Sequence, residues 1–133
     1  MAKISDIIFC LNATNVEGEG ASADRILTAL RPEYIPGLFS FSVVVTVLDL
    51  DPKLEHPFLI LFTDPYGTEI VKAEGTFHTR EDASNLPAKY KGVNMVMNLG
   101  NVNFKVSGEY KMEISIDGNL IQEKLIYVKG QNE

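Results

Sequence analysis

The chain has 133 residues, of which 45% are hydrophobic and 23% charged, and its net charge is −6. Length and composition fit one globular domain over residues 1–133 and exclude a disordered chain. The acidic balance disfavours nucleic acid and anionic membranes as partners, because like charges repel. Cys10 is the only cysteine, and the apolar run from Ile7 to Leu11 is too short for a signal peptide, so we expect a cytoplasmic protein.

The N-terminal region contains one clear strand and one ambiguous segment. Ile4 to Ala13, rich in branched and apolar residues, predicts the first strand. A loop should follow, because turn-forming residues are frequent there: Asn12, Asn15, Gly18 and Gly20. Arg25 to Leu30 fits either a short helix capped by Ser22 or a short strand ended by Pro32. We favour the strand, because the neighbouring segments are strands.

The strongest β pattern lies between Leu38 and Leu50. One face of this strand is uniformly apolar and should point into the core: Phe39, Phe41, Val43, Val45 and Val47. The opposite face begins polar and becomes apolar, which indicates that part of it is covered as well: Ser40, Ser42, Val44, Thr46 and Leu48.

The middle of the chain predicts a hairpin. Phe58 to Phe62 is entirely apolar, which indicates a central strand. Asp64 to Gly67 has proline at the first central position of a turn, and Thr68 to Thr76 follows as the partner strand. His78 to Lys91 is polar and contains Pro87, so we expect a long connection there.

The C-terminal part predicts a strand followed by a hairpin. Val93 to Leu99 alternates as a strand, and Val102 to Val106 leads to the next one. Tyr110 to Ile116 and Leu120 to Val128 flank Asp117-Gly118, a dipeptide typical of tight hairpin turns. The last five residues are polar and should fray.

Together these segments predict an all-β fold: seven or eight short antiparallel strands in a two-sheet sandwich. Ser107-Gly108-Glu109-Tyr110 resembles the tyrosine corner of immunoglobulin-like sandwiches, in which the phenol hydroxyl binds backbone upstream. Met112 stands where immunoglobulin domains place a cysteine. We therefore expect an immunoglobulin-like β-sandwich.

The sequence also resembles an uncharacterised bacterial family of small immunoglobulin-like β-sandwich proteins. The likeness lies in the opening strand, in His56 to Gly67 and in Phe104 to Gly118 around Gly108-Glu109-Tyr110, and Glu17 to Leu30 fits it least well. It covers most of the chain, but its motifs are turns and core residues. The resemblance implies a sandwich fold and implies no activity.

Candidate residues for catalysis are few. His56 and His78 are the only histidines, and so the only usual candidates for a catalytic base. Turn or surface positions explain both histidines. No Gly-x-Ser-x-Gly motif is present in the sequence. Cys10 lies within an apolar strand, where a buried thiol stays protonated and inert. We therefore expect no enzyme, no catalytic residues and no cofactor.

Acidic residues near strand ends raise the possibility of calcium binding: Asp49, Asp51, Asp64 and Glu69. Thr63-Asp64-Pro65-Tyr66 faintly resembles the Ser-Asp-Pro-Tyr of membrane-binding C2 domains. Calcium needs six or more oxygen ligands, however, and Asp-Pro-x-Gly is ordinary turn chemistry. We therefore expect no metal site, and we keep a ligand- or calcium-binding module that uses these loops as the alternative.

Two further patterns have simpler explanations than ligand binding. Basic and aromatic residues are interleaved, as in single-strand nucleic-acid binders, but their density is low enough for solvated strand faces: Lys89, Tyr90, Lys91, Phe104, Lys105 and Lys111. Glu17-Gly18-Glu19-Gly20 is glycine-rich, but its glutamates would repel a phosphate.

The sequence thus predicts a complete fold but contains no recognisable catalytic, metal or cofactor motif. Our leading hypothesis is a non-enzymatic module that binds a protein partner or self-associates within an assembly. Sheet edges and end loops should make the contacts, because both expose unpaired backbone groups.

Overall fold

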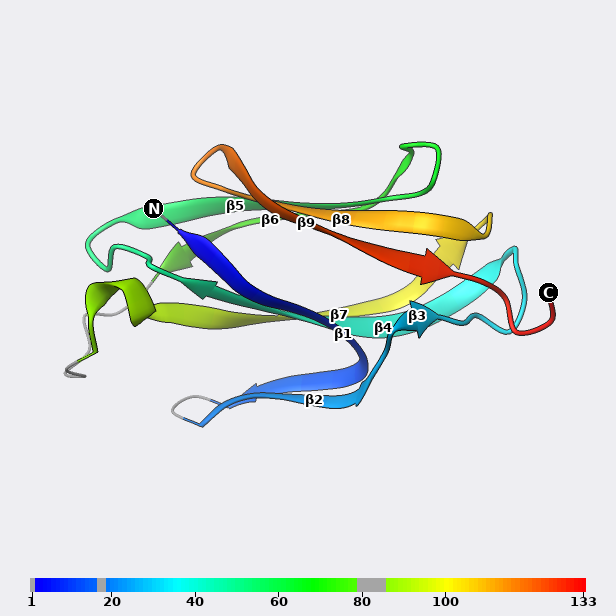
Figure 1. Cartoon of the computed structure of the whole chain (residues 1–133), viewed down its shortest axis with the longest axis horizontal. Helices are drawn as coiled ribbons and strands as arrows, with labels where there is room; N and C mark the ends of the chain where they lie inside the picture. The colour runs from blue at the N-terminus through cyan, green and yellow to red at the C-terminus, as the bar shows by residue number, and fades with distance from the viewer. Residues whose placement is uncertain (1, 17–18, 79–85) are drawn as a thin grey trace.

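The computed structural model describes residues 2–16, 19–78 and 86–133. Within them lie nine strands and one turn of 3-10 helix, shown in Figure 1. In chain order these are β1 (Lys3–Val16), β2 (Gly20–Ile26), β3 (Ala29–Leu30), β4 (Gly37–Leu48), β5 (Glu55–Thr63), β6 (Glu69–His78), η1 (Ala88–Tyr90), β7 (Gly92–Phe104), β8 (Gly108–Ile116) and β9 (Asn119–Val128).

The strands form two sheets that face each other as layers (Figure 1). Sheet A has the order β2-β1-β4-β7, and sheet B has the order β3-β9-β8-β5-β6. All pairs are antiparallel except β3 with β9, which are parallel. The predicted two-sheet sandwich is confirmed, with one strand more than expected because β3 is a separate two-residue strand.

The distribution of the strands between the two sheets is that of an immunoglobulin-like sandwich. Strands β4 and β7 lie in one sheet, whereas β5, β8 and β9 lie in the other, and β6 extends the second sheet beside β5. The N-terminal region contributes to both sheets, with β1 beside β4 and β3 parallel to β9. The immunoglobulin-like fold expected from the sequence is therefore correct.

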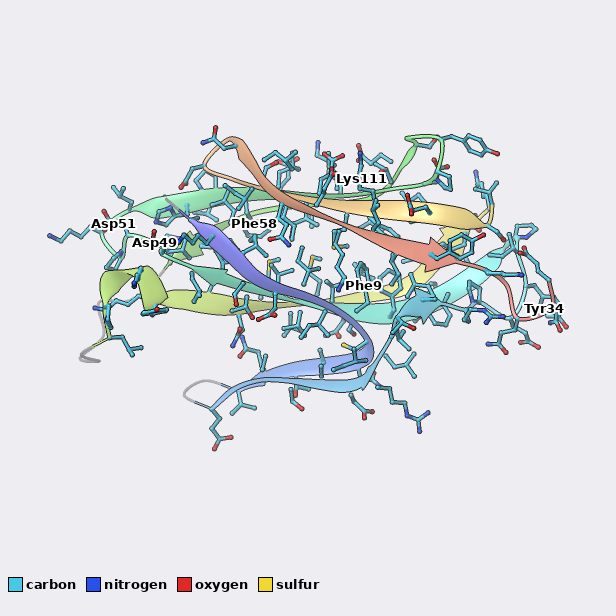
Figure 2. The ribbon with its side chains drawn as sticks, in the orientation of Figure 1. Phe9, Tyr34, Asp49, Asp51, Phe58 and Lys111 are labelled. Carbon is cyan, nitrogen blue, oxygen red and sulfur yellow. The ribbon has the colours of Figure 1, made fainter. Side chains whose placement is uncertain are left out.

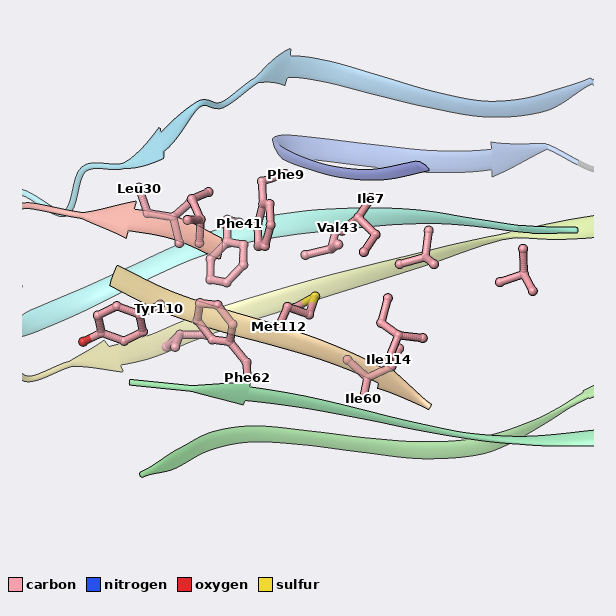
Figure 3. Close-up of a cluster of buried hydrophobic side chains, with 14 of the residues drawn as sticks. Ile7, Phe9, Leu30, Phe41, Val43, Ile60, Phe62, Tyr110, Met112 and Ile114 are labelled. Atoms are coloured by element: carbon pink, nitrogen blue, oxygen red, sulfur yellow. The ribbon is translucent and has the colours of Figure 1, made fainter. Parts of the chain in front are cut away.

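Aromatic rings fill the space between the sheets at one end of the core (Figure 3). Phe41 packs against Phe9 and Phe62, with ring centroids 6.0 and 5.8 Å apart. Tyr110 packs against Phe62 and Phe104 at 5.6 and 5.3 Å. All five side chains are almost fully buried, and large aromatic rings remove more apolar area from water than smaller side chains do.

The tyrosine corner is present at the start of β8. The hydroxyl of Tyr110 donates a hydrogen bond to the backbone carbonyl of Val106 at 2.6 Å, four residues upstream. The predicted last hairpin is also confirmed, because Asp117 and Gly118 both have positive φ, at 55° and 80°. That conformation defines the type I′ turn that suits a two-residue hairpin.

Strand β1 continues past its predicted end at Ala13 into the predicted loop, and it forms an arm with β2. Its first half pairs with β4, and its second half pairs with β2 from Cys10 onward. The arm lies across the outer face of sheet A (Figure 1), where the Asn15 amide donates to the Asn94 carbonyl on β7 at 2.8 Å. Under it lies a second small core formed by Cys10, Ala13 and Val44, so the expected covering of the outer face of β4 is confirmed.

Three local expectations need correction or completion. Arg25 to Leu30 is neither one helix nor one strand: β2 ends at Ile26, Arg25 has a φ of 59°, and β3 begins at Ala29. Strand β7 is continuous, with a register shift opposite Phe39. The C-terminal residues do not fray, because Lys129 and Gln131 donate backbone hydrogen bonds to Leu30 and Pro32. The expected connection from His78 to Lys91 lies partly outside the described residues.

Candidate functional site

The four carboxylates considered for calcium lie at opposite ends of one strand. Asp49 and Asp51 precede β5, at the end of the sandwich far from Tyr34 (Figure 2), whereas Asp64 and Glu69 follow it. A nine-residue strand spans about 27 Å, so the two pairs cannot share an ion. Across residues 2–16, 19–78 and 86–133, no group of three or more potential ligands gathers around one point.

The Asp64 side chain already has a role in its turn. One of its oxygens accepts the backbone N–H groups of Tyr66 and Thr68 at 2.9 and 2.8 Å. This is the turn chemistry that the sequence offered as the simpler explanation. The Oδ1 oxygen of Asp64 therefore helps to hold the β5–β6 turn.

His56 was expected at a turn or surface position, but it is buried near the start of β5, and both of its ring nitrogens are engaged. It is 5% exposed within β5. Nδ1 lies 2.9 Å from the Asp117 carboxylate, and Nε2 donates to the Asp51 carbonyl at 2.9 Å. Burial alone would lower the pKa of His56, but the Asp117 hydrogen bond, the Asp51 carbonyl and the negative charge of both residues together raise it above 6.5.

This arrangement makes His56 a structural residue. Both neighbouring atoms accept hydrogen bonds, so these contacts favour a ring that is protonated at both nitrogens, a form that cannot act as a base. The ring joins the β4–β5 connection to the β8–β9 turn. His78, by contrast, is exposed at the end of β6, 3.8 Å from a Glu55 oxygen, as expected for a surface histidine.

The interleaved lysines and aromatic residues do not form one surface. Lys111 lies on the outer side of sheet B (Figure 2), where it pairs with Glu113 at 2.9 Å. Lys89 lies over the Tyr90 ring beside the start of β7, and Phe104 is fully buried at the end of that strand. No base could stack on Phe104 in this structure. In the acidic glycine-rich segment, Glu17 and Gly18 lie outside the described residues.

A cavity of about 220 Å³ lies beside the tyrosine corner. It is lined by Asp64, Thr68, Glu69, Ile70, Asn103, Lys105 and Tyr110. The hydroxyl of Tyr110 is already bound to the Val106 carbonyl, and the charged groups are of both signs. The sequence did not indicate this cavity, because its residues come from segments far apart in the chain.

The side of the sandwich formed by β6 and β7 is more distinctive, and we call it the β6–β7 side. In the part of the chain that the structure describes, β6 pairs only with β5 and β7 only with β4, so each has an unpaired edge. Apolar side chains on the inner faces of both strands are only partly buried: Ile70, Val71, Ala73, Val93, Met95, Met97 and Leu99. Unpaired edges beside partly exposed apolar groups are the usual features of an interaction surface.

Strand β7 lacks the charged residues and prolines that often protect a sheet edge, although the β4–β7 pair has a register shift opposite Phe39. Its 13 residues include no charged residue and no proline. At the opposite side of the sandwich, by contrast, Lys124 on β9 points inward, lies over the Phe9 ring at 5.5 Å and donates to the Ile7 carbonyl. Inward charges of that kind discourage the addition of another strand, so the two sides of the molecule differ in their capacity for pairing.

The described part of the chain contains no helix with the length and apolar character needed to cross a membrane. Comparison with curated proteins gave no match. Among solved structures, the chain is similar to an immunoglobulin-like protein from Pseudomonas aeruginosa, with 16% identity, a TM-score of 0.49 and coverage of 97% of each chain. It is also similar to the alkylpurine DNA glycosylase AlkC of Pseudomonas fluorescens bound to DNA containing an abasic site analog, with 10% identity and a TM-score of 0.43, covering 96% of this chain and 30% of that one.

The family comparison covers nearly the whole sandwich. The match runs over residues 6–129, from the first half of β1 to the residue after β9. It includes the arm, both sheets and the tyrosine corner. The chain therefore belongs to the family of unknown function DUF6941.

Proposed function

We propose that this protein is a non-enzymatic, cytoplasmic binding module that engages a protein by strand addition on the β6–β7 side. The observation that supports the proposal is the long, uncharged and proline-free edge of β7. Exposed edges are a liability that folded proteins usually block, so an unblocked edge is best explained by a partner that covers it. Strand addition would use the unpaired backbone groups for affinity and the side chains between them for specificity.

The side chains along β7 suit such a partner. Met95 and Met97 are partly buried, and their flexible thioether chains adapt to different neighbouring surfaces. Asn94 and Asn98 lie on the other face of the strand, where their amides add hydrogen-bonding capacity without charge. A segment that pairs with β7 itself should therefore be extended and apolar on alternate residues.

The absence of an enzymatic role is part of the proposal and rests on geometry. Both ring nitrogens of His56 are engaged, and the Cys10 thiol is buried under the arm. Burial raises the pKa of Cys10, and the negative charge of Asp24 adds to this effect against an opposing backbone hydrogen bond. A protonated, covered thiol is a poor nucleophile.

A charge placed on the β7 edge tests the proposal. Asn98 is exposed, and its side-chain oxygen accepts a hydrogen bond from Ser42. Asn98→Lys removes this bond and adds an edge lysine, whereas Asn98→Ala removes the bond alone, so the two variants differ in charge. Proteins that co-purify with the tagged wild type should be lost from Asn98→Lys and retained by Asn98→Ala.

Thermal melts of both variants must first show that each remains folded. If Asn98→Lys retains every co-purifying protein, β7 is not the binding edge. If Asn98→Ala loses the same proteins as completely as Asn98→Lys, the added charge is not the cause, and pairing along this edge is rejected.

A further inference from the structure

We infer that the protein bound on the β6–β7 side is a second copy of this chain, with β6 paired antiparallel to β6 of the partner copy about a two-fold axis at Ala73. The inference rests on the proposed function, because it places a protein partner on the same side of the sandwich, but it pairs that partner through β6 and not through β7. It would join the two copies of sheet B into one continuous sheet. The charges of β6 select both this occupant and its register.

Residues of β6 alternate between the two faces of sheet B. Val71, Ala73, Gly75 and Phe77 stand opposite core-facing residues of β5, and they point inward. Lys72 and Glu74 point outward, with side chains 49% and 63% exposed. The strand therefore carries one positive and one negative charge on its outer face, two residues apart, with Ala73 between them.

This spacing is self-complementary in one antiparallel register. With the two-fold axis at Ala73, Lys72 lies opposite Glu74 of the second copy, and Glu74 lies opposite its Lys72. An axis at Lys72 or at Glu74 would instead place like charges directly opposite each other, which destabilises a strand pair. If one copy of β6 were shifted by one residue along the other, inward-pointing residues would stand opposite outward-pointing ones. Apolar side chains would then turn to the solvent face.

The pairing also uses the contact that already exists within the strand. Nζ of Lys72 lies 2.9 Å from Oε1 of Glu74 in the same chain. In the dimer the four side chains form a square of alternating charge, in which every neighbour has the opposite sign. Networks of this kind contribute more than isolated surface ion pairs, which are worth little.

The inner face fits the same register. Ala73 meets Ala73 of the second copy, and Val71 meets its Gly75, so small residues stand at the centre of the contact. A Cβ at Gly75 would come within 2.7 Å of the Phe58 ring, which shows that this ring covers the glycine inside each copy. The neighbouring Met95 and Met97 on β7 would then contact the second copy and no longer be exposed to water.

Charge reversal and its repair test this register on the purified full chain. Sedimentation velocity from micromolar to millimolar concentration should show a reversible dimer of the wild type. Lys72→Glu or Glu74→Lys alone should raise the dissociation constant about tenfold or more, because each turns two attractive cross-strand contacts into repulsive ones. The double variant Lys72→Glu with Glu74→Lys should restore the dimer.

Lys111 on β8 provides a matched control. It forms the same kind of pair with Glu113, two residues away at 2.9 Å, but β8 lies inside sheet B with strands on both sides. Lys111→Glu should leave the dimer unchanged, and thermal melts should show that all variants are folded. Added salt should weaken the wild-type dimer, because exposed charges are screened.

The failures of the two proposals can be told apart. A wild type that stays monomeric at every concentration, or a double variant that does not regain the dimer, overturns the β6 pairing. The co-purification experiment with the Asn98 variants tests the proposed function independently, because it detects any bound protein and not only a second copy of this chain. A dimer that dissociates on Asn98→Lys but not on either β6 reversal places the contact on β7, which keeps the binding side and rejects the Ala73 register.

Discussion

A single hydroxyl group at Tyr110 fixes the crossover from sheet A to sheet B. It donates to the Val106 carbonyl at 2.6 Å, and the ring packs among Phe62 and Phe104. Tyr110→Phe keeps the ring and deletes the bond, so the free energy of unfolding should fall by about 1 to 3 kcal/mol. Tyr110→Ala should lose about 3 to 5 kcal/mol, as truncated core aromatics do. Urea unfolding measures both.

Tyr127 is the control for this prediction. It lies on β9 with 53% of its surface exposed, so Tyr127→Phe removes a hydroxyl that the fold does not bury. Its unfolding midpoint should be that of the wild type, since surface changes of this kind usually cost little. Equal midpoints for Tyr110→Phe and the wild type would show that the corner bond contributes nothing to stability.

The arm formed by β1 and β2 is the element that the sequence did not reveal. Asn12 and Asn15 are typical of loops, yet they lie in a strand because the arm packs on sheet A. Hairpins were predictable, since a turn and its two flanking strands are local in sequence. The pairing of β3 with β9 was not, because it joins residues about a hundred positions apart.

Cys10 reports on the opening of this arm. Its side chain is fully buried between β1, β4 and β2, so native protein should react slowly with Ellman's reagent. Asn15→Ala removes the hydrogen bond that joins the arm to β7, and it should speed the reaction about three- to tenfold through local opening. The measurement is the labelling rate in native buffer.

A second asparagine separates local from global effects on that rate. Asn132 donates to the Glu33 carbonyl at 2.9 Å, in the C-terminal segment away from the arm. Asn132→Ala should leave the labelling rate of Cys10 unchanged. Rapid labelling of the wild type in native buffer would contradict the buried position of the thiol and reopen a redox role.

At the scale of the whole molecule, the sandwich has one protected side and one open side. Lys124 blocks the β1–β9 side, whereas β7 presents an uncharged edge. The uncharged stretch was visible in the sequence, but its position at an edge depends on strand order. Strand order is set by long-range pairing, so the fold class was predictable from local patterns and the candidate binding side was not.

The stability of the whole molecule should depend on pH through His56. Burial opposes the charged ring, but Asp117 and the Asp51 carbonyl outweigh it, so the pKa in the folded state is above the ordinary 6.5. The stabilisation is therefore fully present below pH 6.5 and is lost as pH rises through the folded-state pKa, because the folded state binds the proton more tightly. The urea concentration at the midpoint of unfolding should decrease as the pH is raised from 6 to alkaline values.

Asp117→Asn isolates this effect from the rest of the molecule. Asn tolerates positive φ and Asn-Gly is a strong type I′ turn, so the β8–β9 hairpin should keep its shape. The variant removes the carboxylate that stabilises the imidazolium, so its stability should vary much less with pH than that of the wild type. His78 is exposed and is the same in both proteins, so it cannot account for a difference between their curves. If the two proteins lose stability in parallel as pH rises, His56 is not held in its charged form, and the tie between the β4–β5 connection and the last hairpin is a neutral hydrogen bond.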